Sequence, residues 1–129
     1  MTHYIRTEEL VAANEEVVEA TGGSTGVREP TMLESIVVKP RATFGGEDLY
    51  PDLYLKAAVL FEAIINYHAF VDGNKRTALA VLIEFLFRND HRFTPDDAEL
   101  ERFTLLVATT NPDLADVAVW IKQHARPVK

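Results

Sequence analysis

Two strongly apolar stretches, separated by a short polar segment, constrain this chain more than any other feature. Residues 53–67 and 78–87 carry apolar side chains almost all the way round a helical wheel, and this pattern indicates helices buried on every side. The segment between them contains HAFVDGNKR at residues 68–76, with a histidine, an aspartate and two adjacent cations. The sequence therefore predicts two central helices joined by a tight polar loop in a fixed position.

The start of the second central helix breaks a common rule of helix composition. Acidic residues usually occupy the first turn, because the helix dipole and unpaired N–H groups make it electropositive. Here Lys75 and Arg76 add two positive charges after a Gly73–Asn74 turn. A bound phosphate would make this arrangement favourable, and a broken local rule often marks a functional site. We therefore predict an anion-binding site; the alternative is a solvated helix start and an ordinary turn.

The remaining sequence predicts shorter helices around this central pair. One helix is expected to follow Thr7 as its cap, and a second begins at Pro30. Two more are expected over residues 98–110 and 114–125. The predicted fold class is all-α: a compact bundle of five or six helices, with at most one short hairpin.

Composition limits the classes of function. The 129 residues suit a single domain, residues 1–129. A net charge of −7 argues against a direct nucleic-acid binder, and the absence of cysteine excludes disulfides and thiolate metal sites. No apolar run approaches the roughly 20 residues of a membrane span, and no secretory signal is visible. We expect a cytoplasmic protein without membrane contact.

The polar segment also resembles a known motif. Its residues fit the pattern H-x-F-x-D/E-G-N-G/K-R, the active-site motif of the Fic/Doc superfamily, at seven positions: His68, Phe70, Asp72, Gly73, Asn74, Lys75 and Arg76. The lysine, followed by Thr-Ala-Leu, is similar to the death-on-curing (Doc) branch, as is the sequence upstream. The resemblance covers about residues 26–93 well and the rest weakly, and it implies a Fic/Doc-like helical fold.

The chemistry of the motif residues suggests their roles. His68 is the candidate general base, since an imidazole can accept a hydroxyl proton near neutral pH; a lone histidine would more simply stabilise a helix C-terminus. Asp72 is a candidate Mg²⁺ ligand through the resemblance, although an aspartate in a turn can equally cap a helix. Gly73, Asn74, Lys75 and Arg76 are the expected phosphate-binding residues.

Two further expectations concern the rest of the chain. Phe70 is interpreted as an apolar anchor of the loop, and no site role is assigned to His3, His91 or His124. Residues 40–52 are rich in glycine and proline, which is typical of a surface loop. The resemblance instead implies a substrate-docking flap beside the site, with Thr43, Phe44, Gly45 and Gly46 at its centre.

The resemblance implies a reaction as well. Adenylylating members usually carry a second arginine where Leu79 stands, and Doc-like members lack it. The expected function is therefore a toxin kinase that transfers the γ-phosphoryl group of ATP, with Mg²⁺, to a Thr or Ser hydroxyl of elongation factor Tu and so inhibits translation. The alternatives are AMP or other nucleotidyl transfer, and a non-catalytic module that binds nucleotide or a partner.

Control by a second protein is expected for such a toxin. The chain has no copy of the family's inhibitory motif S/T-x-x-x-E-G/N. We therefore expect an antitoxin with a disordered segment that folds into a helix on binding. Its predicted groove lies between the N-terminal helix and the flap, near Leu10, Val17 and Phe44.

Overall fold

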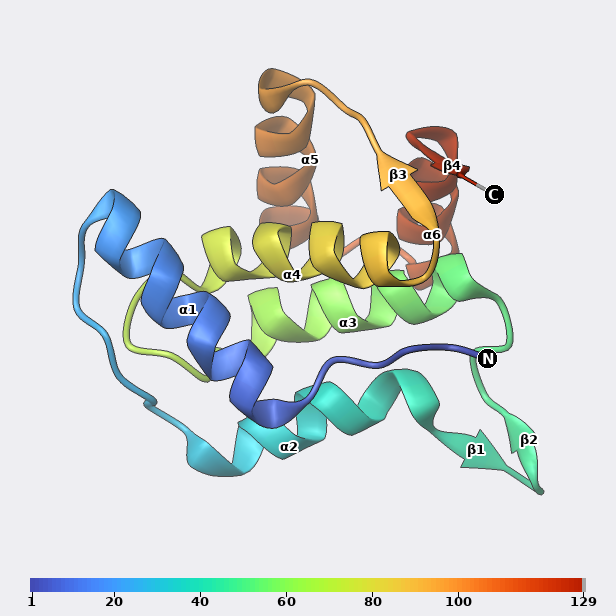
Figure 1. Ribbon diagram of the computed structural model, residues 1–129, viewed down its shortest axis with the longest axis horizontal. Helices are drawn as coiled ribbons and strands as arrows, with labels where there is room; N and C mark the ends of the chain where they lie inside the picture. The colour runs from blue at the N-terminus through green and yellow to red at the C-terminus, as the bar shows by residue number, and fades with distance from the viewer. Residues whose placement is uncertain (129) are drawn as a thin grey trace.

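Helices α3 (Leu53–Tyr67) and α4 (Asn74–Arg88) form the centre of the molecule in the computed structural model, which describes residues 1–128. They lie side by side and run in opposite directions (Figure 1). The central pair is confirmed, but only α3 is buried almost all round. On α4, Ile83 and Phe87 are 44% and 72% exposed, because the neighbouring helices cover only part of its circumference.

Four further helices flank the central pair in the described residues. These are α1 (Thr7–Thr21), α2 (Pro30–Val38), α5 (Asp97–Thr110) and α6 (Leu114–Gln123), with a short 3-10 turn η1 (Lys39–Arg41) after α2. Helix α1 packs on α4, α2 and α6 pack on α3, and α5 contacts both central helices. The predicted all-α bundle is confirmed. No helix in this part of the chain is long and apolar enough to cross a membrane.

An aromatic stack joins the outer helices to the core. The ring of Phe103 on α5 lies between Phe61 of α3 and Trp120 of α6, with centroid distances of 5.7 and 3.8 Å. His124 in turn stacks on Trp120 at 4.0 Å. Large rings bury much apolar surface in a fixed geometry, so this stack holds α5 and α6 against α3.

The predicted cap of α1 is wrong by one residue. Arg6 occupies the N-cap position, and Thr7 is already the first helical residue. The backbone N–H of Arg6 donates to Oε1 of Glu9 at 2.9 Å. The glutamate three residues into the helix therefore fixes its start, as in the second half of a capping box.

Two small strand pairs accompany the helices in residues 1–128, although at most one hairpin was expected. Strands β1 (Thr43–Phe44) and β2 (Glu47–Asp48) form the expected hairpin across a Gly45–Gly46 turn. Strand β3 (His91–Phe93) pairs with β4 (Ala125–Pro127), which begins at the last residue of the helix expected over residues 114–125. Strands that pair over such a distance in the sequence have no turn pattern between them, so the sequence did not predict this pair.

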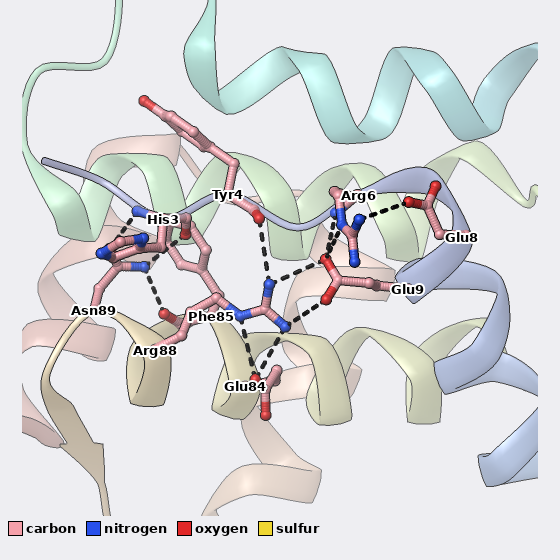
Figure 2. Close-up of polar contacts among 9 residues, drawn as sticks. All are labelled: His3, Tyr4, Arg6, Glu8, Glu9, Glu84, Phe85, Arg88 and Asn89. Carbon is pink, nitrogen blue, oxygen red and sulfur yellow. Dashed lines mark hydrogen bonds and ion pairs between the residues drawn. The ribbon is translucent and has the colours of Figure 1, made fainter.

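A charged cluster fastens the start of α1 to the end of α4 (Figure 2). Arg88 donates to both carboxylate oxygens of Glu9 at 3.0 Å, and it also pairs with Glu84 at 3.0 Å. The hydrogen bond from Arg88 lowers the pKa of Glu9 from 4.5 to about 2, although partial burial opposes the shift. Such bidentate, charge-assisted pairs are stronger than ordinary surface pairs.

We predict that Glu9→Gln lowers the free energy of unfolding at pH 7 by about 1–2 kcal/mol, less than the full pKa shift implies because Glu9 is partly exposed. The pKa of Glu9 is lower in the folded protein, so its contribution is complete above pH 4.5 and is lost as the pH falls toward about 2. Urea unfolding across this pH range should therefore show the two proteins converging in acid.

Glu8→Gln is the matched control for this prediction. Its side chain is 67% exposed and pairs with Arg6 alone among the described residues. The control should change the unfolding free energy little at any pH. An equal loss in both variants would mean that general surface charge, and not the Arg88 pair, stabilises the start of α1.

Candidate functional site

The motif loop, residues 68–73, joins the end of α3 to the start of α4, with left-handed backbone at both ends. His68 is the C-cap of α3 at φ 51° and ψ 46°, and Gly73 is the N-cap of α4 at φ 76° and ψ 19°. A Cβ at Gly73 would lie 3.1 Å from Cγ2 of Val18 on α1. Both backbone conformation and space therefore demand glycine there.

The motif residues line one cavity of about 720 Å³. Its first wall consists of the motif loop and the first turn of α4, including His68, Asp72, Gly73, Asn74, Lys75 and Arg76. Its second wall is the face of α5 that carries Asp97, Leu100, Glu101, Thr104 and Leu105. The structure thus brings the predicted motif residues together and adds a wall that the sequence did not indicate.

The start of α4 presents unpaired donors to this cavity. The first hydrogen bond of the helix runs from the Thr77 N–H to the Gly73 carbonyl at 2.8 Å, so the three preceding N–H groups have no acceptor within the helix. Lys75 is exposed, and its ammonium has no acceptor among residues 1–128. This arrangement suits an anion.

The side chain of Asn74 has a different task from the one predicted. Its Oδ1 accepts the Phe70 N–H at 3.1 Å, and its Nδ2 donates to the Phe70 carbonyl at 3.0 Å. The amide that was expected to contact phosphate therefore closes the motif loop. Only the backbone N–H of Asn74 remains for an anion. Phe70 is 1% exposed, as expected for an anchor.

Arg76 points to the end of α1. Its Nη1 donates to the Thr21 hydroxyl and, at 3.4 Å, to the Gly22 carbonyl. The negative end of the α1 dipole suits a cation. Arg76 also lines the cavity. Both contacts with α1 use Nη1, so Nε and Nη2 remain as donors for a phosphate there.

Asp72 does not cap α4, because Gly73 takes the N-cap position without a side-chain bond. Its Oδ2 accepts the Ser24 N–H at 2.9 Å, and the residue is one of those that line the cavity. Within the described residues, no group of three or more acidic, histidine or cysteine side chains could hold a metal. A single carboxylate fits Mg²⁺ that is held mainly by nucleotide phosphates.

His68 is exposed at the edge of the cavity. Within residues 1–128 its ring has no hydrogen-bond partner in the protein, so both nitrogens are free for a substrate. The other three histidines do not line this cavity. One of them, His124, instead bonds the Trp120 carbonyl through Nδ1 at 2.8 Å.

The hairpin does not lie beside the site, in contrast to the expectation for Thr43, Phe44, Gly45 and Gly46. None of these residues lines the cavity, and Figure 1 shows the hairpin at the opposite end of α3 from the motif loop. Lys56 holds it there, donating to Asp48 at 3.1 Å and to the Pro40 carbonyl at 3.3 Å. A substrate contact by this hairpin remains a prediction.

The predicted partner groove also needs correction. Leu10 is completely buried and cannot line a surface groove. Val17 does line one, of about 520 Å³, but its walls are α1 and α4. Phe44 is 82% exposed on the distant hairpin. The groove that Val17 lines therefore lies between α1 and α4 and not beside the hairpin, and partner binding there stays a prediction.

Sequence reasoning missed the supports behind the motif loop. Asn14 is 1% exposed on α1 and donates to the Asp72 carbonyl. The chain after α1 runs along the loop, with backbone hydrogen bonds from Arg28 to Ala69 at 2.7 Å and from Val71 to Gly26 at 3.0 Å. The available signal was Asn14 itself, a polar residue four positions from Leu10 and Val18 on the buried stripe.

Comparison with known proteins agrees with this geometry. A family model described as "Fic/DOC family" matches residues 4–86. The chain is 39% identical over 121 residues to "Toxin Doc" of Mycolicibacterium smegmatis, covering 92% of this chain and 90% of that protein. It is 33% identical over 115 residues to "Protein kinase doc" of Escherichia phage P1, covering 89% and 90% respectively. The motif, its cavity and these matches together show that the chain belongs to the Fic/DOC family.

Proposed function

We propose that this protein is a Doc-like toxin that acts in the cytoplasm and transfers the γ-phosphoryl group of ATP to a Thr or Ser hydroxyl of a translation factor, elongation factor Tu by family resemblance. The observation that carries the proposal is one cavity lined by His68 with its free imidazole, by the start of α4 with its unpaired N–H groups, and by Lys75. The similarity to a protein named a kinase supports phosphoryl transfer.

The side chains divide the work of such a transfer. His68 accepts the hydroxyl proton while the hydroxyl oxygen bonds to the γ-phosphorus and the bond to the β,γ-bridging oxygen breaks, which leaves ADP. Lys75, Arg76 and the N-terminus of α4 stabilise the charge on the phosphates. The rigid loop keeps these groups in position, which is the main requirement of phosphoryl transfer.

Asp72, a residue of the cavity wall, would hold Mg²⁺ in this scheme through its carboxylate. The ion would supply positive charge to the phosphate oxygens. The bond from Ser24 to the same carboxylate fixes its orientation.

AMP transfer is the alternative reaction, and the cavity has fewer positive groups to stabilise the phosphates that would leave in it. Leu79 lines the cavity at the position where adenylylating relatives carry a second arginine, and it packs partly against the core. A leucine cannot neutralise the outer phosphates that must leave with pyrophosphate. Intact mass of the target distinguishes the options, since it shows a gained phosphate, a gained AMP or, for a non-catalytic module, no change.

We predict that His68→Ala lowers phosphate transfer to purified elongation factor Tu about 10²–10⁴-fold, the usual effect of losing a general base. His3→Ala is the control, because only the backbone of His3 makes hydrogen bonds to Asn89. Labelled ATP and intact mass would measure the rates. Full activity in the His68 variant would exclude the imidazole as the base.

We predict that Lys75→Ala weakens Mg-ATP binding about tenfold or more, as expected for the loss of a charge-assisted contact. Lys75 makes no ion pair within residues 1–128, so its removal should not lower the melting temperature. Lys122→Ala removes the same charge from α6, where the ammonium lies 5.9 Å from the Tyr54 ring. Equal losses in titration calorimetry would place the nucleotide elsewhere.

Expression in a bacterial host tests the toxin assignment. The isolated chain should arrest growth, and co-expression of a cognate antitoxin from a neighbouring gene should restore growth through a stable complex. An antitoxin segment that folds into a helix would fit the groove between α1 and α4, whose floor includes Ala13, Val17 and Ala80. Harmless expression of the folded wild-type chain would refute the toxin assignment.

A further inference from the structure

A buried asparagine lies behind the motif loop, on the face of α1 that packs against it. Asn14 is 1% exposed, and its Nδ2 donates both to the Asp72 carbonyl at 2.9 Å and to the Thr77 hydroxyl at 3.1 Å. One amide group therefore bridges the last turn of the loop and the first turn of α4. Asparagine is costly to bury unless its polar atoms find such partners.

The bond to the Asp72 carbonyl fixes more than one atom. The peptide between Asp72 and Gly73 is planar and trans, because the described residues contain no cis peptide. In a trans peptide the carbonyl and the following N–H point in opposite directions. Since the carbonyl points to Asn14 on α1, the Gly73 N–H points away from α1.

The peptide after Asp72 would otherwise be free to turn. Glycine at position 73 has no Cβ, so steric contacts restrict its backbone dihedrals little and allow the Asp72–Gly73 peptide to rotate. The reversed peptide would aim a carbonyl oxygen, and not an N–H, at a bound phosphate. The close approach of Val18 to Gly73 restricts the space, but only Asn14 supplies a hydrogen bond to this peptide among the described residues.

We propose that Asn14 is a positioning residue of the active site: its bond to the Asp72 carbonyl keeps the Gly73 N–H turned away from α1 and available to a phosphate oxygen in the cavity. The inference rests on the proposed function for its consequence in catalysis. It assigns to α1 a direct part in shaping the phosphate-binding turn, although α1 contributes no residue to the cavity wall.

Asn14→Leu removes both hydrogen bonds and keeps a side chain of similar size, and Asn14→Asp keeps the shape but places a carboxylate against the Asp72 carbonyl. Asn89→Leu is the matched control. Asn89 also joins two segments, donating to the His3 carbonyl at 2.9 Å and the Phe85 carbonyl at 2.8 Å, but it lies at the other end of α4.

Hydrogen exchange provides a readout that does not depend on activity. The amides of Phe70, Val71 and Thr77 are hydrogen-bonded in and next to the loop. We expect these amides to exchange faster in both Asn14 variants than in the wild type. In Asn89→Leu, their exchange rates should change no more than the loss of global stability in that variant accounts for. Unchanged exchange in the Asn14 variants, or equal acceleration in the control, would overturn the proposal.

Kinetics test the catalytic consequence. We expect kcat/KM for Mg-ATP to fall roughly 10–100-fold in both Asn14 variants, because a small displacement of catalytic groups has an effect of this size. The Asn89→Leu variant should keep the wild-type value. Faster exchange with unchanged kinetics would show a merely structural role and would overturn the proposal. If the wild-type protein transfers no phosphate to any target, the proposed function fails, but the exchange experiment still decides whether Asn14 holds the loop.

Discussion

The left-handed turn at Gly73 is the constraint on which the site depends. It allows α4 to start at Asn74, one residue after the turn, so the start of the helix and Asp72 line one cavity. The same turn lets α1 approach within van der Waals distance, since Val18 would contact any Cβ there. Close packing of α1 in turn brings Asn14 to the Asp72 carbonyl. A single glycine thus allows both the candidate anion site and the close packing of α1 that supports it.

The support is distributed along α1. At its start, Arg88 fastens Glu9 to the end of α4, and at its end Arg76 bonds Thr21 and the Gly22 carbonyl. Asn14 lies between these two contacts. Helix α1 is therefore fixed to α4 at three places, and this attachment keeps the motif loop rigid. A loop held in this way needs few contacts of its own.

Local patterns were sufficient for part of this structure. The apolar side chains almost all round residues 53–67 predicted α3, and the Gly73–Asn74 pair before two cations marked the start of α4. Contacts between distant segments left no such pattern. The role of α5 as the second wall, the pairing of β3 with β4 and the use of Asn74 to close the loop all depend on tertiary packing. The hairpin was recognisable from its glycines, but its position at the far end of α3 was not.

The charges of the two cavity walls show how an acidic protein could accommodate the proposed nucleotide. Lys75 and the start of α4 are positive, whereas Asp97 and Glu101 on α5 are negative. Phosphates would be attracted to Lys75 and the start of α4 and repelled by the second wall, so these charges favour one orientation of a nucleotide in the cavity. The protein carries a net charge of −7, which opposes a long polyanion over its whole length. A compact nucleotide instead experiences mainly the groups within about 8 Å, the screening length at physiological salt. A composition that argues against nucleic-acid binding is therefore compatible with a site for ATP.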